Sequence, residues 1–194
     1  MDMAGTNPRL TAHDWARAGL EALEDEGLDG VAVERVAIRL SATKGSFYWH
    51  FANRDALVVA VLDLWRAETE GIIEALDSMT TDPRERLRRL FDLLQSDVPT
   101  NRAEIDLLGR RDNPLVAPVV ERVSTRRIDY LTANLRDAGL PQLQARDNAL
   151  HTYALWLGLL QLQQALPAGI PTGPARKRFM DTTSQLLEHL MAKD

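Results

Sequence analysis

The amino-acid sequence predicts an all-α protein of about nine helices. In every segment with a clear period, apolar residues recur at the three- or four-residue spacing of a helix. No stretch alternates between apolar and polar residues, which is the pattern of a half-buried strand. Proline, glycine and N-capping residues stand at the ends of the periodic segments, where helices start and stop. We therefore expect a helical fold with no β-sheet.

Four helices are expected in the first part of the chain, over residues 11–26, around 33–40, over 43–49, and from 53 or 54 to 77. Gly27 stops the first helix, and Thr43 is available as the N-cap of the third. The apolar positions that define these four helices are Trp15, Gly19, Leu20 and Leu23; Val33, Val36, Ala37 and Leu40; Phe47; and Leu57, Val58, Val61, Leu62, Trp65, Ile72, Ile73 and Leu76.

Five further helices follow, and their ends are punctuated mainly by proline and glycine. Asp82-Pro83 and Asn113-Pro114 each open a helix, because proline is tolerated at the first helical position. The expected helices begin at residue 83, cover 102–111, run from 114 to 137 and cover 143–166 and 174–192. Between the last two of these helices lie Pro167, Gly169 and Pro171.

The composition is that of an ordinary globular protein, with 45% apolar and 26% charged residues among 194. This length corresponds to one domain or two small ones. The absence of cysteine excludes disulfides, thiolate metal sites and cysteine nucleophiles, and four scattered histidines make a metal site unexpected. No signal peptide and no membrane span are recognisable, and no cofactor is expected. These features predict a cytoplasmic protein that does not use a membrane.

Charge is distributed unevenly near the N-terminus, although the net charge is −5. Residues 12–34 hold one basic residue against seven acidic ones. Residues 35–54 hold Arg35, Arg39, Lys44 and Arg54 and no acid. Since charges further apart than about one Debye length, ~8 Å at physiological salt, are largely screened, a phosphate backbone would sense this local patch. The basic segment is thus the first place to look for function.

Two short helices joined by Ser41-Ala42-Thr43 form a helix-turn-helix pattern within that basic segment. The second of them presents hydroxyls, a cation and flat rings, which suit contact with phosphates, sugars and thymine methyl groups. A glycine at position 45 fits a close approach of the backbone to DNA. The alternative is a tight pair of helices inside a bundle, with no DNA contact.

The stretch from Thr43 to Phe51 (TKGSFYWHF), followed by NRDAL, closely resembles the DNA-binding domain of the TetR family of transcriptional regulators. The resemblance covers roughly residues 10–58. It implies a homodimer that binds a palindromic operator in double-stranded DNA, usually as a repressor, and releases it when a small molecule binds. It places at the DNA Thr43, Lys44, Gly45, Ser46, Tyr48, Trp49, His50 and, as a phosphate contact, Arg54.

Two positions depart from the pattern of that family. Ser41 stands at a turn position often held by glycine, and serine at positive φ costs about 1 kcal/mol. Ala32 stands where a serine or threonine commonly caps the second helix, so this cap and its phosphate contact are in doubt.

The C-terminal half is expected to form the dimer. Residues 149–166 are apolar almost all round, so this helix must be covered on two sides, by the domain core and by its copy in a second subunit. The alternative is a central core helix in a monomer. The residues expected at the interface are Leu150, Tyr153, Leu157, Gly158, Gln161, Phe179, Thr183, Leu186 and Leu190.

An effector pocket is expected in the same half. Glu68 and Arg127 each fall on the apolar phase of a long helix, and a buried charge needs a partner. They could pair with each other, anchor a polar group of a ligand, or reach solvent on their long stems. The full set of expected lining residues is Trp65, Glu68, Phe91, Leu94, Leu108, Val119, Val123, Arg127, Tyr130, His151 and Trp156.

Together these observations predict a ligand-responsive, dimeric DNA-binding regulator of the bacterial cytoplasm, found on the nucleoid when bound. Residues 8–53 would form the DNA-binding domain and residues 54–194 the ligand-binding and dimerisation domain. No nucleophile, P-loop or metal-protease motif is present, so an enzyme is not expected. Two alternatives stay open: a regulator of this fold that ignores small molecules, and an all-helical binding protein or enzyme that does not use DNA.

Overall fold

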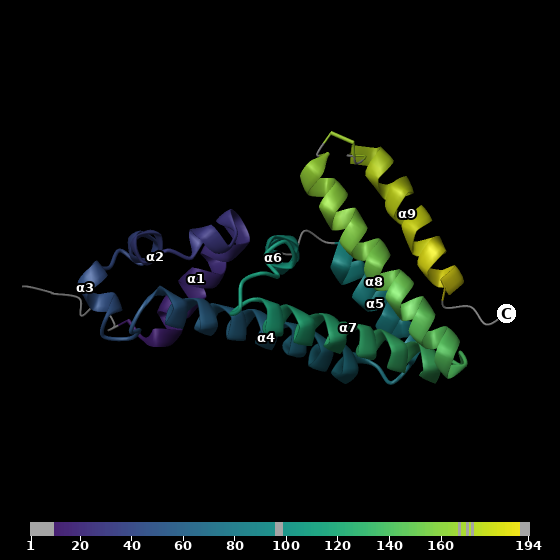
Figure 1. Ribbon diagram of the computed structural model, residues 1–194. Helices are drawn as coiled ribbons and strands as arrows, with labels where there is room; N and C mark the ends of the chain where they lie inside the picture. Colours follow the sequence, from purple (N-terminus) through teal and green to yellow (C-terminus); the bar gives the residue numbers. More distant parts are fainter. Residues whose placement is uncertain (1–9, 96–98, 167, 170, 172, 191–194) are drawn as a thin grey trace, which may run out of the picture.

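The computed structural model describes residues 10–95, 99–166, 168–169, 171 and 173–190. Within these ranges the chain forms nine α-helices, one short 3-10 helix and no strand, as the sequence predicts (Figure 1). The helices are α1 (Ala12–Glu26), α2 (Val33–Arg39), α3 (Lys44–Phe47), α4 (Arg54–Met79), α5 (Pro83–Gln95), α6 (Pro99–Leu108), α7 (Ala117–Asp137), α8 (Gln142–Ala165) and α9 (Gly173–Leu190), with the 3-10 helix η1 (Leu28–Gly30) between α1 and α2.

Local capping explains where the N-terminal helices begin. At α1, the Thr11 hydroxyl accepts the Asp14 backbone N–H at 3.2 Å, and the Asp14 carboxylate accepts the Thr11 N–H at 2.7 Å. Thr43 and Asn53 cap α3 and α4 in the same way, each by accepting a backbone N–H three residues on. These starts agree with the sequence-based boundaries to within a residue.

Several expected boundaries differ from the structure. The sixth helix, expected over 102–111, runs from Pro99 to Leu108. The third helix ends at Phe47 rather than at 49, and residues 48–50 continue as a turn. The seventh helix begins at Ala117 rather than at 114. There the Asn113 side chain accepts the Leu115 N–H at 2.9 Å and the Asn113 carbonyl accepts the Val116 N–H at 3.1 Å, which closes a turn before the helix starts.

The turn of the helix-turn-helix has the strain that the sequence suggests. Ser41 has a φ of 50°, the one positive φ among the described non-glycine residues. Ala32 stands at the N-cap of α2 and makes no side-chain cap, so the doubt about this cap is justified. The turn is nevertheless closed, because the Ala42 N–H donates to the Ala37 carbonyl at 2.8 Å.

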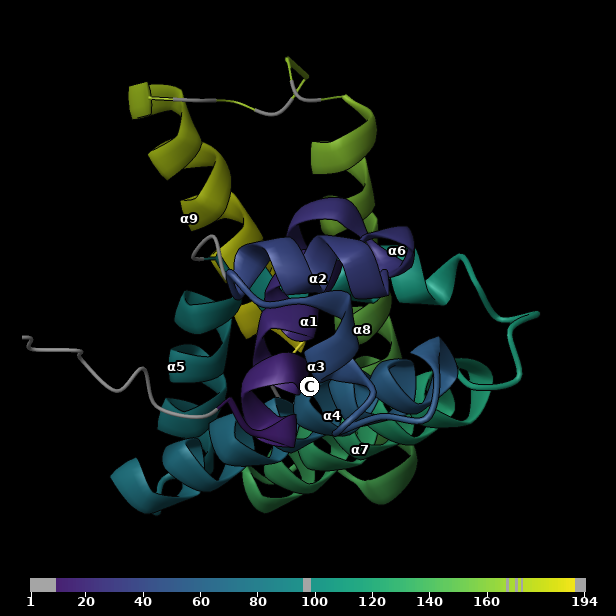
Figure 2. The same ribbon diagram turned by 90° about the vertical axis from the view of Figure 1, so that its left-hand side faces the viewer.

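The first hydrophobic core does not stop at the boundary between the expected domains. It begins with Trp15 and Phe47 under α1–α3, continues through Val61 of α4, and reaches Leu107 of α6 and Val120 of α7. Figure 2 shows the three N-terminal helices lying over α4, with α6 beside them. Helix α6 therefore packs against α1 directly, and α7 shares the same core through α4.

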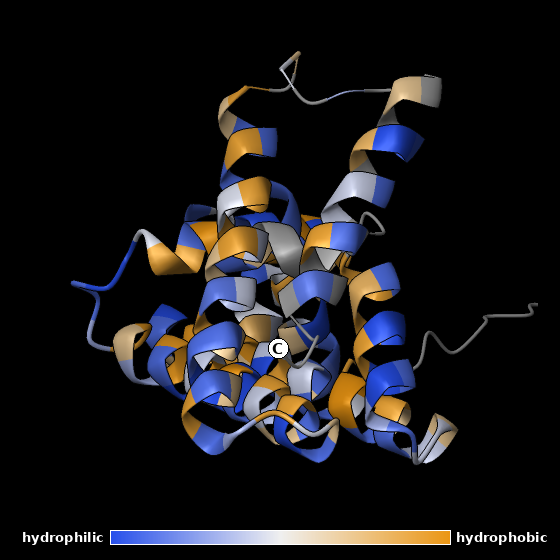
Figure 3. Cartoon of the chain, turned by 90° about the vertical axis from the view of Figure 1, so that its right-hand side faces the viewer, coloured by the Kyte–Doolittle hydropathy of each residue, from blue (hydrophilic) through white to orange (hydrophobic). Residues whose placement is uncertain are grey.

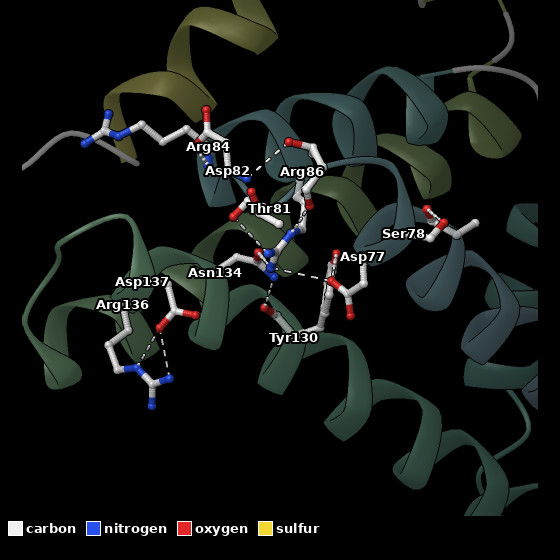
Figure 4. A network of polar contacts seen from close by, with 12 residues as sticks. Asp77, Ser78, Thr81, Asp82, Arg84, Arg86, Tyr130, Asn134, Arg136 and Asp137 are labelled. Carbon is white, nitrogen blue, oxygen red and sulfur yellow. Dashed lines mark hydrogen bonds and ion pairs between the residues drawn. The ribbon is translucent and has the colours of Figure 1, made fainter.

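A second core joins α5, α7 and α8 around Leu87, Leu131 and Leu135. The far end of α4 is tied to it by polar contacts (Figure 4). Arg86 of α5 donates to the Asn134 side chain at 3.0 Å and to the Thr80 carbonyl at 2.9 Å. This network closes the corner between α4, α5 and α7.

Candidate nucleic-acid interface and buried polar cluster

The single turn of α3 is held in place from both sides. Its Thr43 cap accepts the Ser46 N–H at 3.2 Å, and the Ser46 hydroxyl donates back to the Thr43 carbonyl at 2.8 Å. Phe47 is fully buried and meets the Trp15 ring edge-on, with 5.4 Å between ring centroids. The helix is therefore a short but rigid platform.

Large aromatic side chains on this platform face solvent. Tyr48 is 57% exposed and Trp49 81% exposed, whereas His50 is half-buried. Lys44 and Gly45 are also exposed, and a Cβ built at Gly45 would meet only the Thr43 hydroxyl, at an ordinary 3.7 Å. Exposed rings of this size on a rigid surface typically indicate a binding partner.

The cations of this surface are already paired with acids. Lys44 pairs with Glu34, Arg35 with Glu26, and Arg39 with both Glu26 at 2.7 Å and Asp25 at 2.9 Å. The sequence predicts a basic patch without acids, and this prediction is wrong. The acids among residues 25–34 lie next to these cations in the folded chain. These contacts lower the pKa of Glu26 and of Glu34, chiefly through hydrogen bonds from Arg39 and from Lys44.

Arg54 has a structural place beneath α3. Its Nε donates to the Val31 carbonyl at 2.7 Å and its Nη2 to the Leu28 carbonyl at 2.8 Å. This half-buried side chain therefore links the start of α4 to the segment between α1 and α2. In the structure, the Nε and Nη2 groups of Arg54, the residue expected to contact a phosphate, are engaged in these two internal bonds.

A buried polar cluster lies between α4, α6, α7 and α8. Arg127 forms an ion pair with Glu104 and donates to the Thr69 hydroxyl at 3.0 Å, while its guanidinium lies 5.7 Å from the Trp65 ring and 5.3 Å from the Trp156 ring. The side chains of Arg127 and Glu104 are only 16% and 1% exposed. The cluster thus holds one cation and one carboxylate away from water.

Tyr153 completes this cluster. Its hydroxyl donates to Glu104 at 2.5 Å and lies 3.0 Å from the Ser124 hydroxyl. Burial and the neighbouring Glu104 carboxylate raise the pKa of Tyr153 far above its ordinary value, so it stays protonated. The indole N–H groups of Trp65 and Trp156 are buried without a hydrogen-bond partner among the described residues. Such unpaired donors are costly unless something else accepts from them.

Three of the expected lining residues meet in this cluster, namely Trp65, Arg127 and Trp156. Of the possibilities left open for Glu68 and Arg127, their pairing with each other does not occur, because Glu68 pairs with Arg17 at 2.6 Å and Arg127 with Glu104. His151 is exposed on α8 and does not line the interior. The other expected lining residues are packed in the hydrophobic cores: Leu108, Val119 and Val123 in the first, Phe91 and Leu94 in the second, and Tyr130 against Ile73 and Leu76.

Tyr130 also makes a polar contact away from the cluster. Its hydroxyl donates to Asp77 at 3.2 Å, and burial together with this carboxylate raises its pKa to about 12.

Sequence reasoning missed Glu104, although it stands three and four residues before Leu107 and Leu108 and so shares the apolar phase of α6.

The side chains expected to meet a second subunit are mostly exposed or half-buried in the single chain. Leu150 is 43% and Leu186 50% exposed, Gln161 is exposed, and a Cβ at Gly158 would meet nothing within 4 Å. Figure 3 shows apolar and polar residues alternating along the outward sides of α8 and α9. Leu157, Phe179 and Thr183 are half-buried, and the side chain of Leu190 lies outside the described ones. Tyr153 was also expected at the interface, and this expectation is wrong. It is 8% exposed and belongs to the buried polar cluster.

Helix α6 connects the buried polar cluster with the N-terminal helices. Two residues after Glu104, the Asp106 carboxylate accepts the Leu28 N–H at 2.8 Å. Arg110 follows α6 and holds both Asp106, at 3.1 Å, and Asp29 of η1, at 2.8 Å. Gly27 makes this approach possible, since it has a φ of 72° and a Cβ there would lie 2.7 Å from Asp106.

Two classes of site are not found in the described part of the chain. No helix there is long and apolar enough to cross a membrane. The described histidines and acids form no group of three that could hold a metal ion.

Comparison with known proteins places these features in context. The family model of bacterial regulatory proteins of the tetR family matches residues 17–61. The HTH-type transcriptional regulator BetI of Burkholderia lata is 32% identical over 181 residues, which cover 88% of this chain and 90% of that protein. BetI of Burkholderia ambifaria is 31% identical over the same length and coverage.

Solved structures show the same fold at low sequence identity. A protein from Saccharomonospora viridis, described as a transcriptional regulator and solved in complex with choline, has a TM-score of 0.77 at 16% identity, covering 92% of this chain and 95% of that one. NemR from E. coli in its reduced form has a TM-score of 0.70 at 18% identity, covering 93% and 95%.

Proposed function

Because the chain belongs to the TetR family of transcriptional regulators, and so is a regulator rather than an enzyme, we propose that it acts as a dimeric, ligand-released repressor. In this proposal residues 8–53 bind DNA, and residues 54–194 bind an effector and form the dimer, although residues 8, 9 and 191–194 lie outside the described ones. The protein would work in the bacterial cytoplasm, where its palindromic operator is, and would be on the nucleoid when bound.

The observation that carries the proposal is the exposed aromatic and basic surface of α3. Lys44 is exposed on α3 and Tyr48 on the turn that follows it, and the helix is fixed by Thr43 and Phe47. A recognition helix needs this combination, because groove contacts lose affinity when the contacting side chains must first be ordered. Thr43, Ser46, Trp49 and His50 are the further proposed contacts, with Gly45 allowing the backbone to approach. We assign Arg54 the role of supporting this surface, because it joins the start of α4 to the carbonyls of Val31 and Leu28.

The ion pairs on this surface set a testable expectation for DNA affinity. The Glu34 carboxylate neutralises the charge of Lys44, so the acid competes with a DNA phosphate for the same cation. Replacing Glu34 with glutamine is expected to strengthen binding to any duplex about threefold, and the salt slope should steepen as more cation charge becomes available. Fluorescence anisotropy with operator and scrambled DNA over a series of salt concentrations measures both quantities.

The matched control for this prediction is Glu74→Gln on α4. Glu74 is also exposed, but it forms no ion pair in the described structure and lies on α4, away from α3. If Glu34→Gln and Glu74→Gln bound DNA alike, Glu34 would not compete for the DNA-binding cation.

The dimer is proposed to form through α8 and α9. Support comes from the exposed leucines of α8 and from the open space at Gly158, where a partner helix can approach closely. In a symmetric pair each residue of the interface meets the same patch on the other subunit, so one added charge acts twice. Such a dimer would place two recognition helices about one turn of B-DNA, ~34–36 Å, apart.

Leu150→Arg is therefore expected to shift the protein from dimer to monomer in analytical ultracentrifugation at micromolar concentration. Val59→Arg is the control, because Val59 is 45% exposed on α4 and lies outside the proposed interface. A dimer that is unchanged by Leu150→Arg would contradict this interface.

The effector is proposed to bind at the buried polar cluster. The unpaired indole N–H groups of Trp65 and Trp156 support this, because a ligand could accept hydrogen bonds from them. The Saccharomonospora viridis protein is in complex with choline, which makes choline a first compound to test. Because Arg127 already lies over the Trp156 ring and pairs with Glu104, a bound choline would have to displace its guanidinium. A movement of Glu104 would be passed along α6 to Asp106 and Leu28. A regulator that ignores small molecules would show no rise in melting temperature with any effector.

A further inference from the structure

A groove of about 910 Å³ lies apart from the buried polar cluster, between α1, α4 and α5. Figure 2 shows α1 and α5 on the same side of α4. The floor of the groove is apolar and is made by Ile72, Ala75 and Leu76 of α4 and Leu93 of α5. Neither Glu104 nor Arg127 lines it, so the groove and the cluster are separate. Its volume is that of an ordinary small-molecule site.

The charges around the groove leave a surplus of carboxylate. The two arginines that line it are engaged, Arg17 with Glu68 at 2.6 Å and Arg89 with Glu85 at 2.9 Å. By contrast, the other acids that line it, Glu21, Glu24 and Asp92, form no ion pair with any side chain that the structure describes. The groove therefore offers negative charge above an apolar floor.

Glu24 shows the electrostatic consequence of this arrangement. Burial raises the pKa of Glu24 above its ordinary value, and the carboxylates of Glu68 and Asp25 raise it further. A cation placed in the groove would relieve this repulsion.

Gly71 adds an independent observation. It lies in the middle of α4 and lines the groove, and a Cβ built there would meet nothing within 4 Å. Glycine inside a helix is less stable than alanine, and packing within the described chain does not require it here. A larger side chain at this position would therefore extend into the groove.

We propose that this groove is a second ligand site, distinct from the buried polar cluster, and that it binds an amphipathic organic cation. The cationic group lies near Glu21 and Glu24, and the apolar body covers Ile72 and Leu76. Such a ligand contacts α1 of the DNA-binding part together with α4 and α5 of the other part.

Isothermal titration of the full-length protein with three probes tests the ligand class. Octyltrimethylammonium, below its micelle concentration, carries both the cation and the chain. Tetramethylammonium carries the cation alone, and octyl glucoside carries the same chain on a neutral head. The proposal predicts one octyltrimethylammonium per chain at the groove, counted as the binding that Gly71→Leu removes, and bound there at least about tenfold more tightly than either partial probe. Equal binding of either partial probe at this site, or no octyltrimethylammonium binding that Gly71→Leu removes, would overturn it.

Three variants test the place of binding. Glu24→Gln and Asp92→Asn are each expected to weaken octyltrimethylammonium binding about threefold. Gly71→Leu fills the groove and is expected to abolish binding without touching a charge. Glu74→Gln on the same helix, outside the groove, leaves binding unchanged. If all three groove variants bound the probe as the unmodified protein does, the site would lie elsewhere. None of these measurements uses DNA, so their outcome is independent of the proposed repressor function.

Discussion

Tyr48→Ala is expected to weaken binding to the operator about a hundredfold while the dimer and its melting temperature stay unchanged. The Tyr48 side chain is 57% exposed and its main packing contact is the edge-on one with Phe47, at 5.2 Å between ring centroids, so its removal affects the core little. A hydrogen bond to a charged phosphate contributes about 1.5 kcal/mol, and a dimer places two copies on one operator, which gives about 3 kcal/mol in total. Fluorescence anisotropy with labelled operator gives the affinity, and a thermal melt checks the fold.

Tyr48→Phe separates the hydroxyl from the ring and is expected to have most of the same effect. Lys44→Ala is expected to weaken binding similarly and, unlike Tyr48→Ala, to reduce the salt slope by about two, because two phosphate contacts are lost per dimer. Val59→Ala, at a 45% exposed position on α4, should bind DNA normally. Normal binding by Tyr48→Ala or Lys44→Ala would mean that α3 does not enter the groove.

Arg127→Met is expected to destabilise the protein by about 3–5 kcal/mol, because it leaves the 1% exposed Glu104 without its cation. Urea unfolding at one fixed protein concentration measures the change. The double variant Glu104→Gln/Arg127→Met removes both charges and should recover most of the loss, as expected for a buried ion pair.

The neighbouring residue supplies the control. Arg126 pairs with Glu70 at 3.0 Å, but both side chains are more than a third exposed. Arg126→Met should therefore cost less than about 1 kcal/mol. Equal effects of Arg126→Met and Arg127→Met would show that burial of the Glu104–Arg127 pair does not contribute to stability.

The folded double variant Glu104→Gln/Arg127→Met should also lose the rise in melting temperature that the effector produces.

The parts of the fold that could be predicted are those with local causes. Thr11, Thr43 and Asn53 cap helices through contacts three residues away, and Gly27 stops α1 through its own φ of 72°. Ser41 was expected to strain its turn for the same kind of local reason. The start of α7 was misplaced because Asn113 closes a turn before Ala117, an arrangement that Pro114 alone does not reveal.

The proposed DNA surface could be found from sequence because one continuous segment builds it. The buried polar cluster could not, because α4, α6, α7 and α8 each contribute to it, and spacing along the chain does not show that Arg127 meets Glu104 rather than Glu68. The same limit explains the misjudged charge patch. Glu34 and Lys44 are ten residues apart in sequence but in direct contact.

The most direct test of the central proposal is selection of the full-length protein on a pool of random duplex DNA at moderate salt, followed by sequencing. A dimer with two recognition helices predicts an enriched inverted repeat, with half-site centres about one helical turn, roughly 10 base pairs, apart. The enrichment should vanish for Tyr48→Ala. A folded dimer that enriches no sequence, or enriches a single half-site without a symmetric partner, would contradict the proposed symmetric repressor.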